Sequence, residues 1–255
     1  RRLGSRIMKY SYLSETVSIK KVSETPTLGS FSVEGLYTGY GVTLGNALRR
    51  ALLSSLPGAA ITQVKIHGVD HEFSTLPGMT EDIVEFLLNL KQVRFHFFAD
   101  EPQALMLKVK GEKAVTAADI QSTPSVQVVN KDLHLATLTK KNAELDVELT
   151  VEKGLGYVTA ESRKLERLPV GPVVLDAIFS PVARVEFFVE DMRVGERTDY
   201  NRVRMEIETD GTISPSEALH KASNVLKDHF EKVSAVPVMK TEVGIEEKPK
   251  KKKSK

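Results

Sequence analysis

Residues 39–58 read GYGVTLGNALRRALLSSLPG, and this segment organises the whole chain. Thr43 is a candidate N-cap and Pro57-Gly58 a stop signal, so the pattern predicts one bounded helix between them. Small and apolar residues recur within it at offsets of three and four, which places them on one helical face. That face, which we expect to be buried, carries Leu44, Ala47, Leu48, Ala51, Leu52 and Ser55.

The opposite face of this helix is less ordinary. A rotation of about 100° per residue puts Leu53 roughly opposite the stripe, flanked by Asn46, Arg49 and Arg50. A leucine among arginines on an outer face indicates a second contact surface, although a solvated face with one exposed leucine explains the spacing equally well. Gly45 within the helix costs about 1 kcal/mol relative to alanine, which favours a site where another backbone comes close.

The composition is that of an ordinary soluble protein. With 255 residues the chain can form one large domain or two smaller ones. The sequence contains no run of eighteen apolar residues and no signal-peptide pattern, so it predicts neither a membrane span nor secretion. The absence of cysteine excludes disulfides, zinc–thiolate sites and thiol nucleophiles, and it fits a reducing compartment such as the cytoplasm.

The net charge of +2 is not spread evenly along the chain. Residues 246–255 hold six lysines and two glutamates, so the other 245 residues carry 30 basic and 32 acidic side chains. A nearly neutral body lacks the basic surface with which a domain grips nucleic-acid phosphates. The lysine-rich end, residues 237–255, is predicted to be disordered.

The first two thirds of the chain pass from extended to helical patterns and back. Residues 9–33 supply one or two strands, and residues 60–66 read as another. A second helix is predicted from about Gly78 to Lys91, because two acids lie in its first turn and a lysine at its end. Between 93 and 159 the apolar period switches to two, which indicates a strand-rich unit.

The last third predicts a strand pair followed by a long helix. Val182–Val189 and Val203–Ile207 alternate as two strands would. Ser214, Pro215 and Glu217 then form a helix-start signature. The helix that follows carries an apolar seam about five turns long, made of Leu219, Ala222, Val225, Leu226, Phe230 and Val233.

This order predicts an α+β fold with two domains. Residues 8–57 and 180–236 form a discontinuous first domain, and residues 58–179 form an inserted strand-rich domain. Both helices with apolar seams then belong to the first domain, and pairing two copies through four helices is an economical way to bury those seams. The sequence therefore predicts a homodimer with an interface made of Leu44, Ala47, Leu48, Ala51, Leu52, Leu219, Ala222, Leu226, Phe230 and Val233.

No catalytic pattern assembles in this sequence. Gly39, Gly41 and Gly45 approach a dinucleotide fingerprint, but their spacing is one residue too long for G-x-G-x-x-G. The six histidines include no H-E-x-x-H, and no P-loop sequence occurs. We therefore predict no catalytic, metal-binding or cofactor-binding residue. Two alternatives stay open, a stand-alone nucleotide-binding enzyme and a free nucleic-acid-binding protein.

Taken together, these motifs resemble one known family. Residues 40–58 closely resemble the signature of the N-terminal domain of the bacterial and plastid RNA polymerase alpha subunit. The resemblance runs from about Met8 to Val236 and keeps the family's order and spacing through further blocks at 71–75, 81–91, 115–120, 154–158, 180–182, 197–199 and 209–218.

The resemblance implies a non-catalytic subunit of DNA-directed RNA polymerase, a nucleotidyltransferase whose active site lies in its large subunits. It implies a homodimer that starts assembly by docking the beta subunit on one copy and the beta-prime subunit on the other. The docking residues implied by the matching positions are Asn46, Arg49, Arg50, Leu53, Lys91, Gly154, Gly156, Tyr157, Asp176, Pro181, Arg197, Thr198 and Asp199.

Where most family members continue into a C-terminal domain that binds promoter DNA, this sequence ends in its lysine-rich stretch. We therefore expect little direct contact with DNA. The resemblance also implies a cytoplasmic protein, at the bacterial nucleoid or in the plastid stroma.

Overall fold

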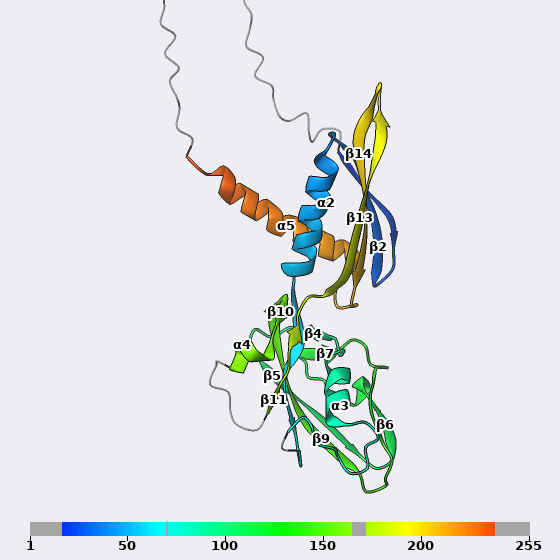
Figure 1. Ribbon diagram of the computed structural model, residues 1–255, viewed down its shortest axis with the longest axis vertical. Helices are drawn as coiled ribbons and strands as arrows, with labels where there is room; N and C mark the ends of the chain where they lie inside the picture. The colour runs from blue at the N-terminus through cyan, green and yellow to red at the C-terminus, as the bar shows by residue number, and fades with distance from the viewer. Residues whose placement is uncertain (1–16, 70, 165–171, 238–255) are drawn as a thin grey trace, which may run out of the picture.

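The computed structural model describes residues 17–69, 71–164 and 172–237. These residues form two lobes that follow one another along the long axis of the molecule (Figure 1). The extended pattern expected before residue 17 and the lysine-rich end from residue 238 lie outside the described residues. The mixture of helices and several sheets makes the fold α+β, as predicted.

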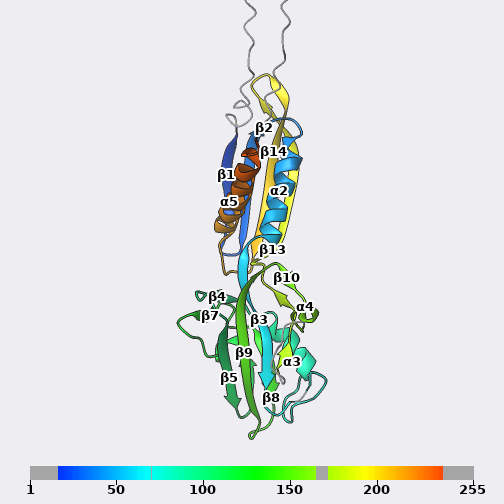
Figure 2. The same cartoon turned by 90° about the vertical axis from the view of Figure 1, so that its left-hand side faces the viewer.

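The upper lobe contains one antiparallel sheet with the strand order β1-β2-β14-β13. The helices α2 and α5 lie against one face of it, next to each other in Figure 2. Strands from the two ends of the described chain thus share one sheet. The bounds are β1 (Ser18–Glu24), β2 (Leu28–Leu36), α2 (Tyr40–Ser54), β13 (Val182–Val194), β14 (Arg197–Thr209) and α5 (Pro215–Ser234).

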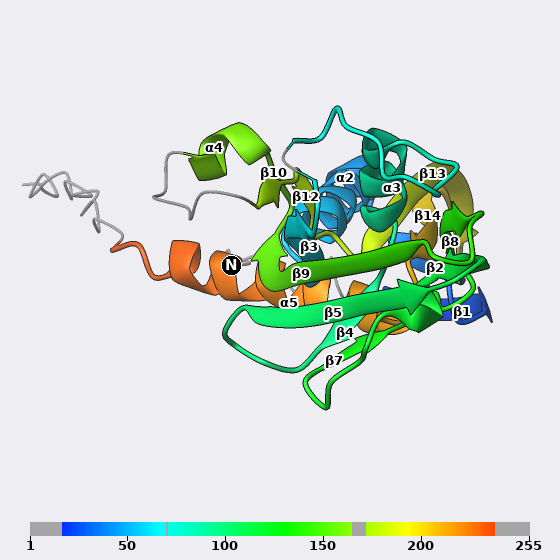
Figure 3. The same cartoon turned by 90° about the horizontal axis from the view of Figure 1, so that it is seen from below.

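The lower lobe is built on a second antiparallel sheet with the order β11-β3-β9-β5. Figure 3 looks at this lobe from below and shows β5 beside β9. Strand β9 alternates as a half-buried strand should, with Leu145, Val147, Leu149 and Val151 fully buried. The sheet strands are β3 (Pro57–Ile66), β5 (Gln103–Lys110), β9 (Glu144–Leu155) and β11 (Val173–Val174).

Short elements complete the lower lobe. Helix α3 (Ile83–Leu90) is capped by Asp82, whose side chain accepts a hydrogen bond from the Glu85 backbone at 2.7 Å. Three strand pairs and two short helices make up the rest of the lobe. They are β4 (Phe95–Phe97) with β7 (Val126–Val128), β6 (Lys113–Thr116) with β8 (His134–Leu138), β10 (Tyr157–Val158) with β12 (Ala177–Ile178), η1 (Ala117–Asp119) and α4 (Ala160–Lys164).

The chain passes between the lobes directly after α2 and directly before β13, and the two crossings touch. A Cβ atom built on Gly58 would lie 1.9 Å from the backbone oxygen of Phe179, so only glycine fits there. The Phe179 ring also covers Gly154, where a Cβ atom would meet it at 2.6 Å. An ion pair of 3.7 Å between Arg94 and Asp210 joins the lobes nearby. The junction is therefore closely packed.

The long first helix differs from the prediction at its start. It begins at Tyr40, preceded by Gly39 in the left-handed conformation with φ of 80°, and Thr43 is not its N-cap. The glycine at position 39 supplies the turn that a threonine cap would otherwise make. Gly45 does mark a close approach, but the neighbour is the Phe187 ring of β13, 2.5 Å from an ideal Cβ atom, and no backbone.

Candidate dimerisation and docking surfaces

The predicted dimer stripe on α2 is largely covered by the chain itself. Leu48, Ala51 and Leu52 are buried in the upper core, with Leu52 at 0% exposure. Leu44 and Ala47 are half-buried at the edge of this packing. The three buried side chains have little surface left for a second copy, so they hold α2 on its own sheet.

The first half of α5 is capped and packed against the upper lobe, whereas its second half is exposed to solvent. The Ser214 side chain accepts a hydrogen bond from the Glu217 backbone at 3.3 Å, and Pro215 occupies the first turn. The buried residues of the helix, Pro215, Ala218 and Ala222, all belong to its first half. From residue 223 onward no residue of α5 is buried, and Phe230 and Val233 are 64% and 66% exposed.

This difference between the halves follows from where α5 crosses α2. Figure 1 shows α5 crossing α2 and continuing beyond it, away from the sheet. A hollow of about 320 Å³ lies at the crossing, between the two helices. Its lining residues are Ala47, Arg50, Ala51, Ser54, Ser55, Val225, Leu226 and His229. The predicted dimer residues Ala47 and Leu226 therefore border the same hollow as the predicted docking residue Arg50.

The predicted outer face of α2 has two different parts. Asn46 and Arg50 are exposed, as a contact surface requires. Leu53 is half-buried and packs against the upper core, so its expected position opposite the buried stripe is wrong. Arg49 donates a hydrogen bond from Nε to the Val185 backbone oxygen of β13 at 3.2 Å. Strand β13 passes beside α2, and Arg49, one helical turn before Leu53, reaches its backbone, so this flank of the helix is not an open outer face.

Lys91 and Asp176 meet at the end of α3, although they are far apart in sequence. Their side chains form an ion pair of 3.2 Å, and the other Asp176 oxygen accepts a hydrogen bond from the Ala160 backbone at 2.8 Å. The Ala160 backbone donor and then Lys91 lower the pKa of Asp176 below its ordinary value. Two predicted docking residues thus form one ordered, partly exposed polar site.

The predicted glycine loop after β9 divides into exposed and structural positions. Tyr157 is 59% exposed and is available to a partner. Gly156 adopts a φ of 61°, which favours glycine in the turn between β9 and β10. Gly154 is covered by the Phe179 ring, and Pro181 is buried, so neither offers a side chain for docking.

Arg197 and Asp199 form a second ordered polar site, near the tip of the β13–β14 hairpin. Two hydrogen bonds, of 3.0 Å from Nε and 2.7 Å from Nη2, join the guanidinium to the carboxylate. Thr198 between them is exposed. The hairpin tip lies at the end of the molecule remote from the lobe that carries α3 (Figure 1). The structure therefore separates this site from Lys91 and Asp176.

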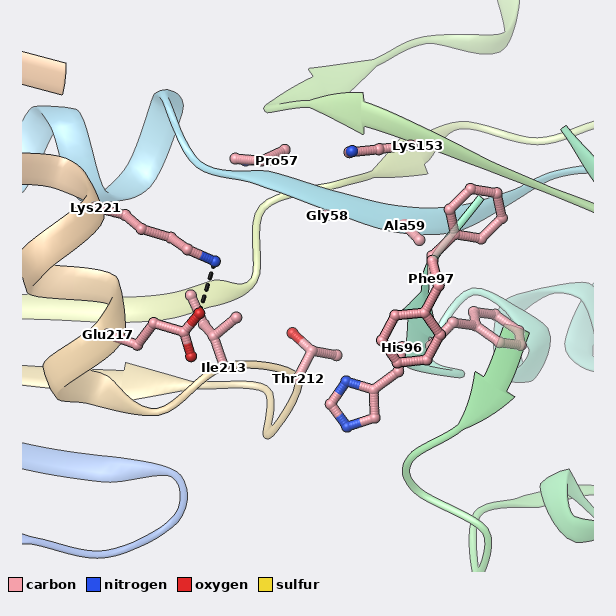
Figure 4. A pocket seen from close by; sticks show the side chains of 12 residues that line it. Pro57, Gly58, Ala59, His96, Phe97, Lys153, Thr212, Ile213, Glu217 and Lys221 are labelled. Atoms are coloured by element: carbon pink, nitrogen blue, oxygen red, sulfur yellow. Dashed lines mark ion pairs between the residues drawn. The ribbon is translucent and has the colours of Figure 1, made fainter. Parts of the chain in front are cut away.

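A cavity of about 300 Å³ lies between the lobes, beside the junction. Figure 4 shows Glu217 and Lys221 of α5 at one side and His96 and Phe97 of β4 at the other, with Lys153 of β9 above. Glu217 and Lys221 pair with each other at 2.7 Å. No group of three or more acidic or histidine side chains in the described ranges is placed to hold a metal ion. Among the helices in those ranges, none is long and apolar enough to cross a membrane.

Comparison with known proteins gives consistent matches. Residues 64–180 match the model of the RNA polymerase Rpb3/RpoA insert domain. A DNA-directed RNA polymerase subunit alpha from Symbiobacterium thermophilum is 50% identical over 210 residues, which cover 82% of this chain and 66% of the relative. That of Alkaliphilus metalliredigens is 45% identical over 230 residues, covering 88% and 73%. That of a Roseiflexus species is 45% identical over 224 residues, covering 88% and 69%.

The chain thus spans about two thirds to three quarters of the length of these curated relatives. The matching insert-domain model covers most of the lower lobe, and the aligned relatives cover both lobes. The chain belongs to the family of DNA-directed RNA polymerase alpha subunits.

Proposed function

We propose that this chain is a non-catalytic scaffold that dimerises and then docks the beta and beta-prime subunits of RNA polymerase. In this proposal the upper lobe is the dimerisation domain and the lower lobe is an inserted domain that contacts the large subunits. The polymerase active site belongs to the large subunits. The observation that carries the proposal is the open second half of α5, with Phe230 and Val233 exposed beyond its own lobe.

The exposed end of α5 favours a second copy as its partner. Phe230 and Val233, near the end of α5, and Val236, just after it, are each more than 60% exposed, and the helix continues past the sheet it packs on. Large apolar side chains gathered at one place mark interaction sites. The half-buried Leu219 and Leu226 extend the same seam back to the α2–α5 crossing. A two-fold pairing would bring the α5 ends of the two copies together and cover these side chains.

The docking part of the proposal is supported by ordered polar groups on the surface. Arg50 and Asn46 are exposed on α2, and Lys91 is held by Asp176 at the end of α3. Exposed ion pairs contribute little to the stability of a chain. Charged groups fixed in one geometry can instead give a partner orientation and specificity. We therefore propose Asn46, Arg50, Lys91, Asp176 and Tyr157 as large-subunit contacts.

The packing of the glycines argues against a nucleotide-binding enzyme. Gly41 faces Val189 and Gly45 faces Phe187, so both serve close contact between α2 and β13. The Gly39 backbone N–H donates to the Asn201 side chain at 2.7 Å. A phosphate cradle needs such backbone donors to point at a ligand. These glycines are used for packing and for the start of the helix.

The proposal is tested by reconstitution. Purified chain should sediment as a dimer, and addition of both large subunits should give a complex with two copies of this chain and one of each large subunit. Arg50→Ala should leave the dimer intact and weaken recruitment of a large subunit. Tyr40→Ala, at an exposed position on the first turn of α2, is the matched control. A folded monomer that recruits neither large subunit would refute the proposal.

A further inference from the structure

The cavity between the lobes has the size and the position of a small-molecule site. Its volume of about 300 Å³ lies at the lower end of the range of such sites, about 300–1,000 Å³. Small-molecule sites are also common where two domains meet. Figure 4 shows His96 and Phe97 of the lower lobe facing Thr212 and Ile213 of the upper lobe across the cavity. A molecule bound there would contact both lobes.

Stacked rings form part of the cavity wall on the side of the lower lobe. The rings of His96 and Phe98 have centroids 6.3 Å apart and planes at 19° to each other. Phe98 is nevertheless 69% exposed, which leaves most of its surface in contact with solvent. Aromatic rings pack favourably on other flat, apolar rings. This wall therefore favours a ligand with a planar apolar ring.

The charged groups that line the cavity favour an anion. Lys221 pairs with Glu217 at 2.7 Å, so these two side chains together add no net charge. Lys153 is bound more loosely, because its Nζ atom lies 3.9 Å from a carboxylate oxygen of Asp100, whose side chain is fully exposed. An ion pair this open to water holds its partners weakly. The ammonium of Lys153 is therefore available to a negatively charged ligand.

His96 supplies a hydrogen-bond donor that the described part of the chain does not use. Its ring is stacked on Phe98, but neither ring nitrogen is hydrogen-bonded to another residue in the described ranges. A neutral imidazole carries one N–H donor. The Thr212 hydroxyl nearby is already engaged, because it donates to Asp210 at 2.6 Å. His96 and Lys153 thus leave two donors for an anionic oxygen in the same cavity.

We propose that the cavity between the lobes binds a small organic anion that carries one planar apolar ring. The ring packs on His96 and Phe98, and the anionic group accepts hydrogen bonds from the Lys153 ammonium and a His96 ring nitrogen. Because the ligand contacts both lobes, its binding stabilises the folded chain. The inference goes beyond the scaffold function, since none of these three residues belongs to the proposed dimer or docking surfaces.

The test uses phenyl phosphate as the probe, titrated into the full chain at constant ionic strength and followed by amide NMR. The amides of Ala59 and Thr212, one from each lobe, should shift together and saturate with a dissociation constant in the millimolar range. Phenol lacks the anionic group and inorganic phosphate lacks the ring, so each should bind at least about tenfold more weakly. No saturable shift at tens of millimolar phenyl phosphate, or equal binding of inorganic phosphate, would overturn the proposal.

The variant Lys153→Gln tests the charged half of the site. It should weaken phenyl phosphate about fivefold to tenfold and leave phenol within about twofold. Lys108→Gln is the matched control, because Lys108 is 49% exposed on the neighbouring strand β5, compared with 47% for Lys153, and does not line the cavity. An unchanged affinity in Lys153→Gln, or an equal loss in Lys108→Gln, would contradict the assignment of the anionic group.

The variant Phe98→Leu tests the aromatic half. It should weaken phenyl phosphate and phenol by the same factor, about threefold to tenfold, because both lose the same ring contact. Without a probe, its thermal midpoint should match that of the unmodified chain, since Phe98 is mostly exposed. Full affinity for both probes in this variant would place the ligand elsewhere and refute the proposal. No large subunit enters these titrations, so their failure leaves the scaffold function intact.

Discussion

Truncation of Phe230 to alanine should dissociate the dimer without loosening the fold. Phe230 is 64% exposed in the single chain. An aromatic side chain has about 200 Å² to bury, so a partner would cover roughly 130 Å² of it, and truncation to alanine removes about 80 Å² of that area. At about 25 cal/mol per Å² the change costs about 2 kcal/mol per copy and about 4 kcal/mol per dimer, which raises the dimer dissociation constant about a thousandfold.

Sedimentation velocity over a range of concentrations measures this change directly. Phe98→Ala is the matched control, because Phe98 is 69% exposed but belongs to the lower lobe. The thermal midpoint, measured where both proteins are monomeric, should not move for either variant. If Phe230→Ala associates as tightly as the unmodified chain, or if Phe98→Ala weakens the dimer equally, the reasoning from the open end of α5 is wrong.

Three further predictions concern the fold and one carboxylate. Leu52→Ala should lower the free energy of unfolding by about 2–5 kcal/mol, because Leu52 is fully buried; a loss below about 1 kcal/mol in denaturant titration would contradict its place in the core. Gly58→Ala should destabilise the junction, since its Cβ atom would overlap the Phe179 backbone oxygen, and a chain that melts at the unmodified temperature would refute that contact. The hydrogen bonds from Arg197 are the largest cause that lowers the pKa of Asp199 from 3.8 to about 2. Its contribution to stability is therefore complete above about pH 4 and is lost as the pH falls through about 2. Carboxyl NMR should find that low midpoint, and Arg197→Ala should return it toward 3.8; a midpoint already at 3.8 in the unmodified chain would contradict the ion pair.

The periodicity of α2 and α5 predicts their existence and their apolar stripes, but not which neighbour covers each stripe. An apolar stripe on a helix predicts that this face is buried, but it does not predict which element or which copy of the chain covers it. In α2 the buried side chains, such as Leu48 and Leu52, serve the chain's own sheet. In α5 the first half packs within the lobe, whereas Phe230 stays open. That division depends on where the two helices cross, which is a tertiary property.

The long hairpin shows why strand ends are harder to predict than strand centres. Strands β13 and β14 extend beyond the predicted ranges to Val194 and back to Arg197. On the open sheet face the apolar alternation gives way to charged cross-strand neighbours, such as Arg184 with Glu208 at 3.1 Å and Arg204 with Glu190 at 3.5 Å. Such pairs support strands without any hydrophobic signal.

The contact between the Tyr37 ring and the Arg197 guanidinium had no signal in the sequence. Tyr37 lies 160 residues before Arg197, and only the pairing of β14 with β2 brings them together. A tyrosine alone at the end of a strand is unremarkable in composition. Its role depends on a register that periodicity does not specify.

The two chain segments that join the lobes pack against each other at Gly58 and Phe179. This packing matters for how two identical copies of the chain could bind two different large subunits. At this junction the Phe179 backbone oxygen occupies the space that a side chain at position 58 would need, so the two crossings are packed directly against each other. In the proposed assembly, both copies would offer the same surface to different large subunits. The asymmetry of the finished complex would have to come from the shapes of the large subunits, because each would contact a different part of the same surface.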